Sequence, residues 1–184
     1  TRRKTRKAIE TPGHAHELTF GCHRGMALLL DERVCWQVLE TIRRARSSLQ
    51  FELWAYVLMP THVHLLLYPK TETYRMATIL KAIKMPSAQF ALRLIKTEDP
   101  AFASKLRVDR PNGRCEHRFW QQGGGYDRNL TSKKAIRASY DYIHANPRTA
   151  SLVAREEDWP WSSAAALAGR QDVLVPDALP RVSE

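Results

Sequence analysis

The fold is decided by residues 51–68, which read FELWAYVLMPTHVHLLLY. Residues 51–59 and 62–68 are two runs rich in side chains that favour strands, and each has the length of one strand. Only Pro60 and Thr61 separate the two runs, and a connection this short joins antiparallel neighbours. We therefore predict two adjacent antiparallel strands in the middle of a sheet.

Elements on both sides extend this pair. Residues 16–23 alternate well enough for an earlier strand. Asp31 is a suitable N-cap for a following helix, because apolar side chains then recur at helical spacing. A long helix is predicted over 73–96, which Pro86 should kink or split.

The second half of the chain is less regular. Residues 98–114 are predicted to form a loop, and residues 115–121 a short last strand. Gly123–Gly125 is expected to be a flexible link or a hinge. A final helix is predicted over 132–146, closed by Pro147.

The predicted order is β-α-β-β-α-β followed by one more helix. This is an α+β fold of the ferredoxin-like, split βαβ kind, with helices on one face of a central antiparallel sheet. The expected organisation is a basic N-terminal arm over 1–15, a folded domain over 16–165 and a tail over 166–184.

Composition narrows the class of protein. The 184 residues include 29 Lys and Arg against 19 Asp and Glu, a net charge of +10. Such an excess favours a polyanionic partner, most commonly nucleic acid. No apolar run is long enough to span a membrane. The three cysteines are too few for a disulfide scaffold and are expected to be buried free thiols in a reducing cytosol.

Two histidines are the first candidate functional residues. His62 and His64 are two residues apart on a predicted strand, so their side chains should share one face. Two adjacent imidazoles can hold one divalent metal ion and leave coordination positions open. A pair of buried histidines hydrogen-bonded to the backbone remains an equally good interpretation.

The last predicted helix carries further candidate functional residues. Ile136, Tyr140 and Ile143 form one stripe, which indicates the side that faces the core. Tyr142 lies on the other side among small residues, and Asn146 follows it by one turn. A tyrosine, an amide oxygen and two histidines together suggest metal-assisted phosphoryl transfer with tyrosine as the nucleophile. An interfacial tyrosine beside a helix-ending asparagine is the structural alternative.

The motifs resemble those of a known family. Residues 58–67, LMPTHVHLLL, resemble the HUH (His-hydrophobic-His) motif of single-tyrosine transposases. Residues 142–147, YIHANP, resemble the helix that carries their nucleophile, and FWQ at 119–121 and DWPWSS at 158–163 also match. The combination is most similar to the REP-associated tyrosine transposases, over residues 16–163.

The resemblance implies roles for particular residues. It makes His62, His64 and Asn146 ligands of Mg²⁺ or Mn²⁺, and Tyr142 the nucleophile. It implies a transposase that cuts and rejoins hairpin-containing single-stranded DNA in the cytoplasm, near the nucleoid, through a 5′-phosphotyrosine intermediate. Relatives act as monomers or as homodimers, so both states stay open.

Contacts to DNA are assigned only by charge. The candidates are basic side chains in the N-terminal arm and around the start of the tyrosine helix. They are Arg2, Arg3, Lys4, Arg6, Lys7, Arg118, Arg128, Lys133, Lys134 and Arg137. Ordinary solubilising charge explains each of them equally well.

Two rival functions keep the same fold. In the first, the protein is a domesticated hairpin-DNA binder whose metal site is structural or vestigial. In the second, it is an RNA-binding ferredoxin-like module. The chain lacks the aromatic strand of that second class, so it ranks lowest.

Overall fold

The computed structural model describes residues 10–180 of the chain. The elements of its first half are β1 (Ala15–Gly21), a short 3₁₀ turn (His23–Gly25), α1 (Glu32–Leu49), β2 (Phe51–Met59), β3 (His62–Pro69) and α2 (Met76–Glu98). Those of the second half are α3 (Pro100–Lys105), β4 (Arg107–Asp109), β5 (Cys115–His117), β6 (Tyr126–Leu130), α4 (Lys133–Thr149), a second 3₁₀ turn (Glu156–Asp158) and α5 (Ser163–Leu167).

Four antiparallel strands form the central sheet in the order β2-β3-β1-β6. The tight β2–β3 hairpin predicted from residues 51–68 is confirmed, with Met59 opposite His62 at its closed end. The α+β class is confirmed as well. The fourth strand, however, is not the predicted one.

The prediction of the last strand at 115–121 is wrong. Residues 115–117 pair with β4 in a separate two-stranded ribbon, and the sheet takes β6 as its edge strand. The sequence of β6, YDRNL, shows no apolar alternation, because most of its side chains stay at least partly exposed at the sheet edge. The segment predicted as a loop also contains α3 and β4.

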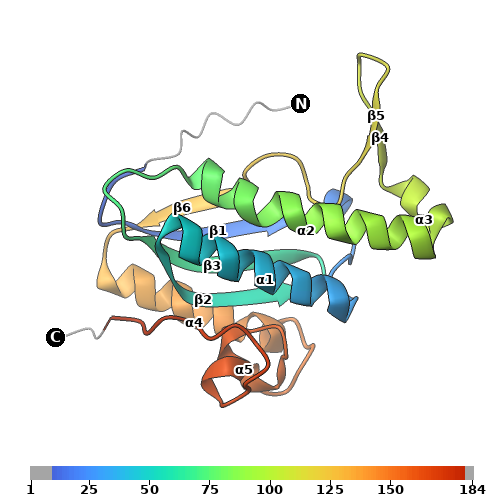
Figure 1. Ribbon diagram of the computed structural model, residues 1–184. Coiled ribbons are helices and arrows are strands. Elements are labelled where there is room, and N and C mark those ends of the chain that lie inside the picture. The colour runs from blue at the N-terminus through green and yellow to red at the C-terminus, as the bar shows by residue number, and fades with distance from the viewer. Residues whose placement is uncertain (1–9, 181–184) are drawn as a thin grey trace.

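Helices cover both faces of the sheet. Helices α1 and α2 lie over one face, where alternate residues of β3 such as Val63, Leu65 and Leu67 join the larger apolar core (Figure 1). Helix α4 lies on the opposite face and packs over β2 and β3 through the buried Ile143. The predicted extra helix therefore covers the face of the sheet that α1 and α2 leave open.

The two prolines expected to interrupt helices, Pro86 and Pro147, both lie inside helices. Helix α2 continues through Pro86 as one element, so the helix is not split there, one of the two outcomes expected. Helix α4 passes Pro147 and ends at Thr149, three residues later than predicted. Each proline costs its helix one backbone hydrogen bond, and in these helices tertiary packing outweighs that loss.

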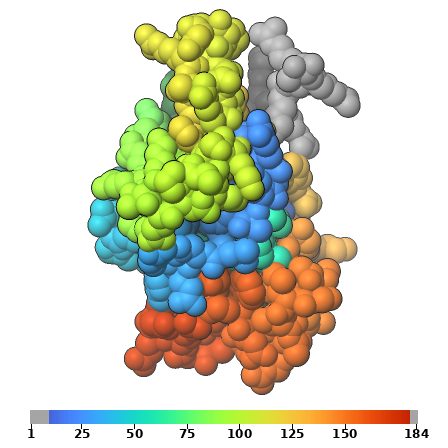
Figure 2. Space-filling view, turned by 90° about the vertical axis from the view of Figure 1, so that its right-hand side faces the viewer, coloured from blue at the N-terminus to red at the C-terminus, as the bar shows by residue number. Residues whose placement is uncertain are grey.

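The β4–β5 ribbon stands out from the body of the molecule (Figures 1 and 2). It carries Cys115, which is exposed, so the expectation of three buried thiols is wrong for this one. Cys22 and Cys35 are buried as expected. Within residues 10–180, none of the helices has the length and apolarity that crossing a membrane requires.

Candidate active site

The pleat of β3 places His62 and His64 on the face of the sheet that α4 covers. Leu66, two residues further on, belongs to the core beneath α4. The two imidazole rings lie edge to face, with centroids 4.7 Å apart. The expectation that the two histidines share one face is confirmed.

Each histidine is held by a threonine hydroxyl. Thr61 Oγ1 is hydrogen-bonded to His62 Nδ1 at 2.9 Å. Thr19 Oγ1, from the strand position opposite His64, is hydrogen-bonded to His64 Nδ1 at 2.8 Å. Each ring therefore uses Nδ1 for a hydrogen bond to threonine and leaves Nε2 for another ligand. In metal sites, a hydrogen bond of this kind to one ring nitrogen orients the histidine that binds the metal through the other.

His64 Nε2 is buried and has no hydrogen-bond partner among the described residues. A buried polar atom without a partner costs about 1–3 kcal/mol, so the native protein should supply one. Burial, together with the neighbouring His62, lowers the pKa of His64 to about 4, and burial also lowers the pKa of His62. Both rings are thus neutral near pH 7, the form in which imidazole binds a metal ion. The two histidines fit a divalent metal.

Helix α4 brings Tyr142 to the same place. Ser132 caps the helix by accepting a hydrogen bond from Ala135 N, and Ile143 anchors it in the core. The Tyr142 ring meets the His64 ring edge to face, with centroids 5.5 Å apart. The tyrosine side chain is still 53% exposed, so a large substrate can reach its hydroxyl.

Asn146 lies one helical turn after Tyr142 and is half-buried. Its Nδ2 makes a long contact of 3.5 Å with the Tyr142 carbonyl oxygen, which leaves its amide oxygen available. Among the described residues, no three His, Cys, Asp or Glu side chains are grouped so as to hold a metal ion.

A buried contact that we did not predict fixes the tyrosine helix to the sheet. His144, two residues after Tyr142, is hydrogen-bonded through Nε2 to Ser163 Oγ at 2.7 Å. Ser163 Oγ in turn accepts a hydrogen bond from Tyr56 N and donates one to Tyr56 O. One hydroxyl therefore connects α4 to the edge strand β2.

The segment before Ser163 runs along that same edge. Leu58 N donates to Trp161 O at 2.8 Å, and Trp159 Nε1 donates to Leu58 O at 2.9 Å. Trp161 is buried against α1, so it packs in the core rather than presenting a surface for bases. The DWPWSS motif matched the family pattern, but nothing in its residue types indicated that it anchors the tyrosine helix.

The basic residues predicted to bind DNA do not form one cluster of free charges. Arg118 is paired with Glu116, and Arg137 with Asp141. Arg128 lies 3.7 Å from Glu17. Lys133 and Lys134 are exposed in the first turn of α4. Arg2, Arg3, Lys4, Arg6 and Lys7 lie outside the described residues.

The chain is similar to known proteins in both sequence and structure, and no family model matches it. A Haemophilus influenzae protein with the provisional name of REP-associated tyrosine transposase is 27% identical over 157 residues, covering 82% of this chain and 84% of its own length. A solved REP-associated tyrosine transposase, bound to a REP hairpin, superposes with a TM-score of 0.64 and 18% identity. It covers 98% of this chain and 96% of that one, and at this identity the match shows the fold.

The sheet presents a His-Val-His strand to a tyrosine-bearing helix. The chain is thus similar to the named relative in sequence and to the solved REP-associated tyrosine transposase in fold.

Proposed function

We propose that the protein cuts and rejoins single-stranded DNA beside a hairpin, with Tyr142 as the nucleophile. The observation that carries this proposal is the contact between the rings of Tyr142 and His64. These residues are 78 positions apart in the sequence, and the exposed Tyr142 side chain covers the buried His64 from the side that a DNA strand can reach.

The metal site would consist of His62 and His64, with Asn146 as the third ligand. A bound Mg²⁺ or Mn²⁺ would polarise a non-bridging oxygen of the scissile phosphate as a Lewis acid. Thr19 and Thr61 would hold the two imidazoles in the tautomer that offers Nε2. The buried Nε2 of His64 supports this assignment, because it has no other partner among the described residues.

The covalent step would take place at the Tyr142 hydroxyl. Its oxygen attacks phosphorus, the bond from phosphorus to the 3′ oxygen breaks, and the proton lost by tyrosine balances the one gained by the departing 3′-OH. The product is a 5′-phosphotyrosine. Attack by a 3′-OH reverses the step, so cutting and joining exchange one phosphodiester for another and need no energy source.

Hairpin DNA is the substrate that the comparisons favour. The solved relative was bound to a REP hairpin, and a net charge of +10 suits a polyanionic partner. Lys133 and Lys134, at the start of the tyrosine helix, would contact phosphates near the cut. The protein would then act on DNA in the cytoplasm.

A gel assay for covalent adducts tests the proposal. The protein is mixed with hairpin oligonucleotides labelled at either end and with Mn²⁺, then denatured and resolved by mass. We expect a metal-dependent adduct that carries the fragment on the 3′ side of the cut. Tyr142→Phe should abolish the adduct and leave hairpin affinity within about twofold, since the exposed hydroxyl contributes little to binding.

Tyr140→Phe is the matched control, because Tyr140 lies on the same helix but packs toward the core. It should still form the adduct. An adduct that persists in Tyr142→Phe, or that forms in EDTA, would show that the assigned nucleophile or the metal site is wrong.

The second candidate is a hairpin-binding protein without strand-transfer activity. The match to a hairpin-bound structure supports binding on its own. Tight, metal-independent binding with no adduct, on oligonucleotides that include the native hairpins, would favour this candidate.

A further inference from the structure

Strand β6 leads directly into the helix that carries Tyr142. It lies at the edge of the sheet beside β1, and most of its side chains are at least partly exposed. Helix α4 begins three residues after β6 ends (Figure 1). The position of the tyrosine helix therefore depends in part on the contacts that hold β6 against the rest of the sheet.

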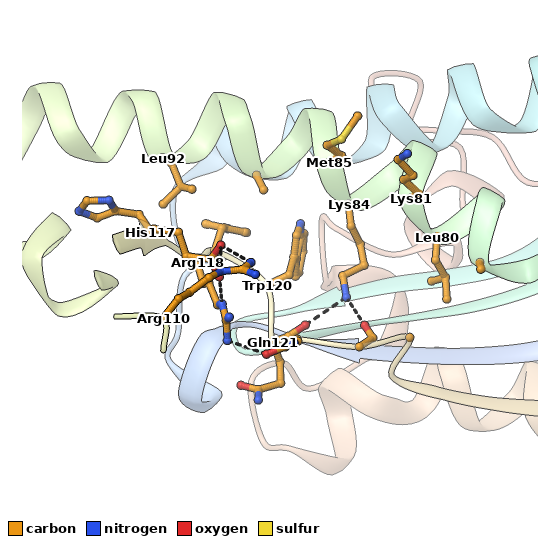
Figure 3. Close-up of a pocket in the computed structure, with 17 residues that line it drawn as sticks. Leu80, Lys81, Lys84, Met85, Leu92, Arg110, His117, Arg118, Trp120 and Gln121 are labelled. Atoms are coloured by element: carbon orange, nitrogen blue, oxygen red, sulfur yellow. Dashed lines mark hydrogen bonds and ion pairs between the residues drawn. The ribbon is translucent and has the colours of Figure 1, made fainter. Parts of the chain in front are cut away.

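The segment that enters β6 is held by helix α2. Lys84 Nζ donates to Gln121 O at 3.2 Å and to Gly123 O at 2.8 Å (Figure 3). These two bonds fix the backbone just before the strand. They leave the strand itself to be held by its pairing with β1 and by its own side chains.

Inside β6, Asp127 is bound by a buried histidine. His16 of β1 has no exposed surface. Its Nδ1 lies 2.8 Å from Asp127 Oδ1, and its Nε2 lies 2.7 Å from the hydroxyl of Tyr74, in the segment before α2. The Tyr74 hydroxyl also donates to Thr11 O at 3.0 Å. One imidazole thus joins β1, β6 and the segment before α2.

These contacts fix the protons of the ring. A phenol carries one proton and Tyr74 gives it to Thr11 O, so the Tyr74 oxygen must accept from His16 Nε2. A carboxylate only accepts, so Nδ1 must donate to Asp127. Both ring nitrogens are donors only in the imidazolium form. The three hydrogen bonds are therefore complete only when His16 is a cation paired with Asp127.

The groups around the ring agree with this charge. Burial raises the pKa of Tyr74, and the carboxylates of Asp127 and Glu10 raise it further, so the phenol keeps its proton. Asp127 supplies the negative charge beside Nδ1. The residues opposite the histidine on the two neighbouring strands, Asn129 and Leu67, do not ionise. A buried charge is tolerated in a protein when it is paired in this way.

We propose that His16, protonated on both ring nitrogens, is a positioning residue for strand transfer. Its ion pair with Asp127 holds β6, and through β6 the start of the tyrosine helix, against the rest of the sheet. The proposal rests on the proposed function for the reaction that uses this helix. A neutral ring can donate only one hydrogen bond, so loss of the second proton releases either Asp127 or Tyr74. Adduct formation should then slow as the pH rises through the titration of His16.

Nuclear magnetic resonance of protein labelled with ¹⁵N in its histidines tests the charge without DNA or metal. Long-range ¹H–¹⁵N correlations separate an imidazolium ring from both neutral tautomers. The His16 signals are assigned through the Tyr74 ring, whose centroid lies 5.5 Å away. At pH 6 we expect His16 to carry two protons. In Asp127→Asn the amide can donate to Nδ1, so the ring should carry one. A single proton on His16 in the wild type would overturn the proposal.

Single-turnover adduct formation at saturating hairpin DNA tests the role in the reaction. Between pH 6 and pH 8.5, the wild-type rate should fall in step with the loss of the second His16 proton. Asp127→Asn keeps both hydrogen bonds around a neutral ring, so it should react nearly as fast as the wild type at pH 6 but lack this fall. Asp127→Ala cannot bind the ring, and its rate should be lower by about tenfold with hairpin affinity unchanged, because small displacements of a reacting group are costly.

Asp172→Asn is the matched control, since Asp172 is an exposed carboxylate paired with Arg170 in the C-terminal segment. It should keep both the wild-type rate and its fall with pH. A wild-type pH profile in Asp127→Asn, or a wild-type rate in Asp127→Ala, would contradict the positioning role.

Hydrogen exchange of the free protein separates this proposal from strand transfer itself. Asp127→Ala should speed exchange of the backbone amides of β6 and of the first two turns of α4, while α1 exchanges as in the wild type. If the wild type forms no adduct, but the ring carries two protons and exchange responds in this way, strand transfer fails and the holding of β6 by His16 stands. If the adduct forms and exchange of β6 is unchanged, only the role of His16 fails.

Discussion

At the scale of single residues, the site depends on which imidazole nitrogen is left free. Thr19 and Thr61 engage Nδ1 of His64 and His62, and this leaves Nε2 of each ring for a ligand. Neither threonine stands out in the sequence, since a hydroxyl beside a histidine is common. The role of the Thr19 hydroxyl can be recognised only from the sheet register, which sets Thr19 opposite His64.

Thr19→Val should therefore weaken metal binding without changing the ligands themselves. Loss of an outer partner of this kind typically lowers metal affinity 10- to 100-fold. Titration of the metal-free protein with Mn²⁺, followed by electron paramagnetic resonance, measures this without any DNA. Thr19→Ser keeps a hydroxyl and should restore most of the affinity. Equal Mn²⁺ affinity in Thr19→Val and the wild type would show that the hydroxyl does not orient His64.

At the scale of elements, the sequence was most informative where apolar patterning was strong. The β2–β3 hairpin, the Asp31 cap of α1 and the shared face of the two histidines all follow from local pattern. The edge strand β6 does not, because an edge strand with exposed side chains needs no apolar alternation. The anchoring of α4 was missed for another reason. It joins residues 144 and 163 through tertiary structure, which spacing along the chain does not encode.

The link between Gly125 and β1 can be tested by substitution. Gly125 has a φ of +78°, and a Cβ atom there would lie 2.1 Å from Thr19 O. A side chain at this position would therefore collide with the backbone of β1. Gly125→Ala should destabilise the protein by about 3 kcal/mol or prevent folding, whereas Gly124→Ala should cost less than about 1 kcal/mol. Urea unfolding followed by circular dichroism compares them, and equal stabilities would contradict the packing described.

The anchor between α4 and β2 gives a second prediction. His144→Ala removes the hydrogen bond to Ser163 and leaves a small cavity, so it should cost about 2–4 kcal/mol of stability. Because α4 then loses a fixed position, the maximal rate of adduct formation should fall at least tenfold, with hairpin affinity unchanged. Single-turnover kinetics at saturating DNA separate the two effects. His144→Gln, which keeps a polar group, should recover part of the rate, and a fall in affinity alone would argue against a positioning role.

At the scale of the whole molecule, the sheet separates two apolar cores with different tasks. The larger core under α1 and α2 holds most of the buried apolar side chains, and the smaller one supports α4 and the candidate site. The stability of the folded protein can therefore be changed by residues that lie far from the candidate active site.

His23 is such a residue. It is buried, and neither ring nitrogen has a hydrogen-bond partner among the described residues. Burial lowers its pKa below 6.5, and Arg24 and Arg118 lower it further. Below pH 6.5 the unfolded chain therefore binds a proton that the folded chain does not. The free energy of unfolding should accordingly fall as the pH falls from 6.5.

His23→Leu should reduce this dependence, because leucine has similar bulk and does not titrate. Urea unfolding at several pH values between 7 and 5 gives the slope for both proteins. The wild type should lose more stability over that range than the variant. Parallel slopes would show that His23 is not the group responsible.

The contact between Tyr142 and His64 has a consequence for how the protein works in dilute solution. Tyr142, the proposed nucleophile, and His64, a proposed metal ligand, meet within one chain and are held by its own core, so the proposed site is assembled without a second copy. The rate of cutting per polypeptide should then be independent of the protein concentration. A rare protein, present in a few copies in each cell, would keep its full activity, because nothing in the site is lost by mass action.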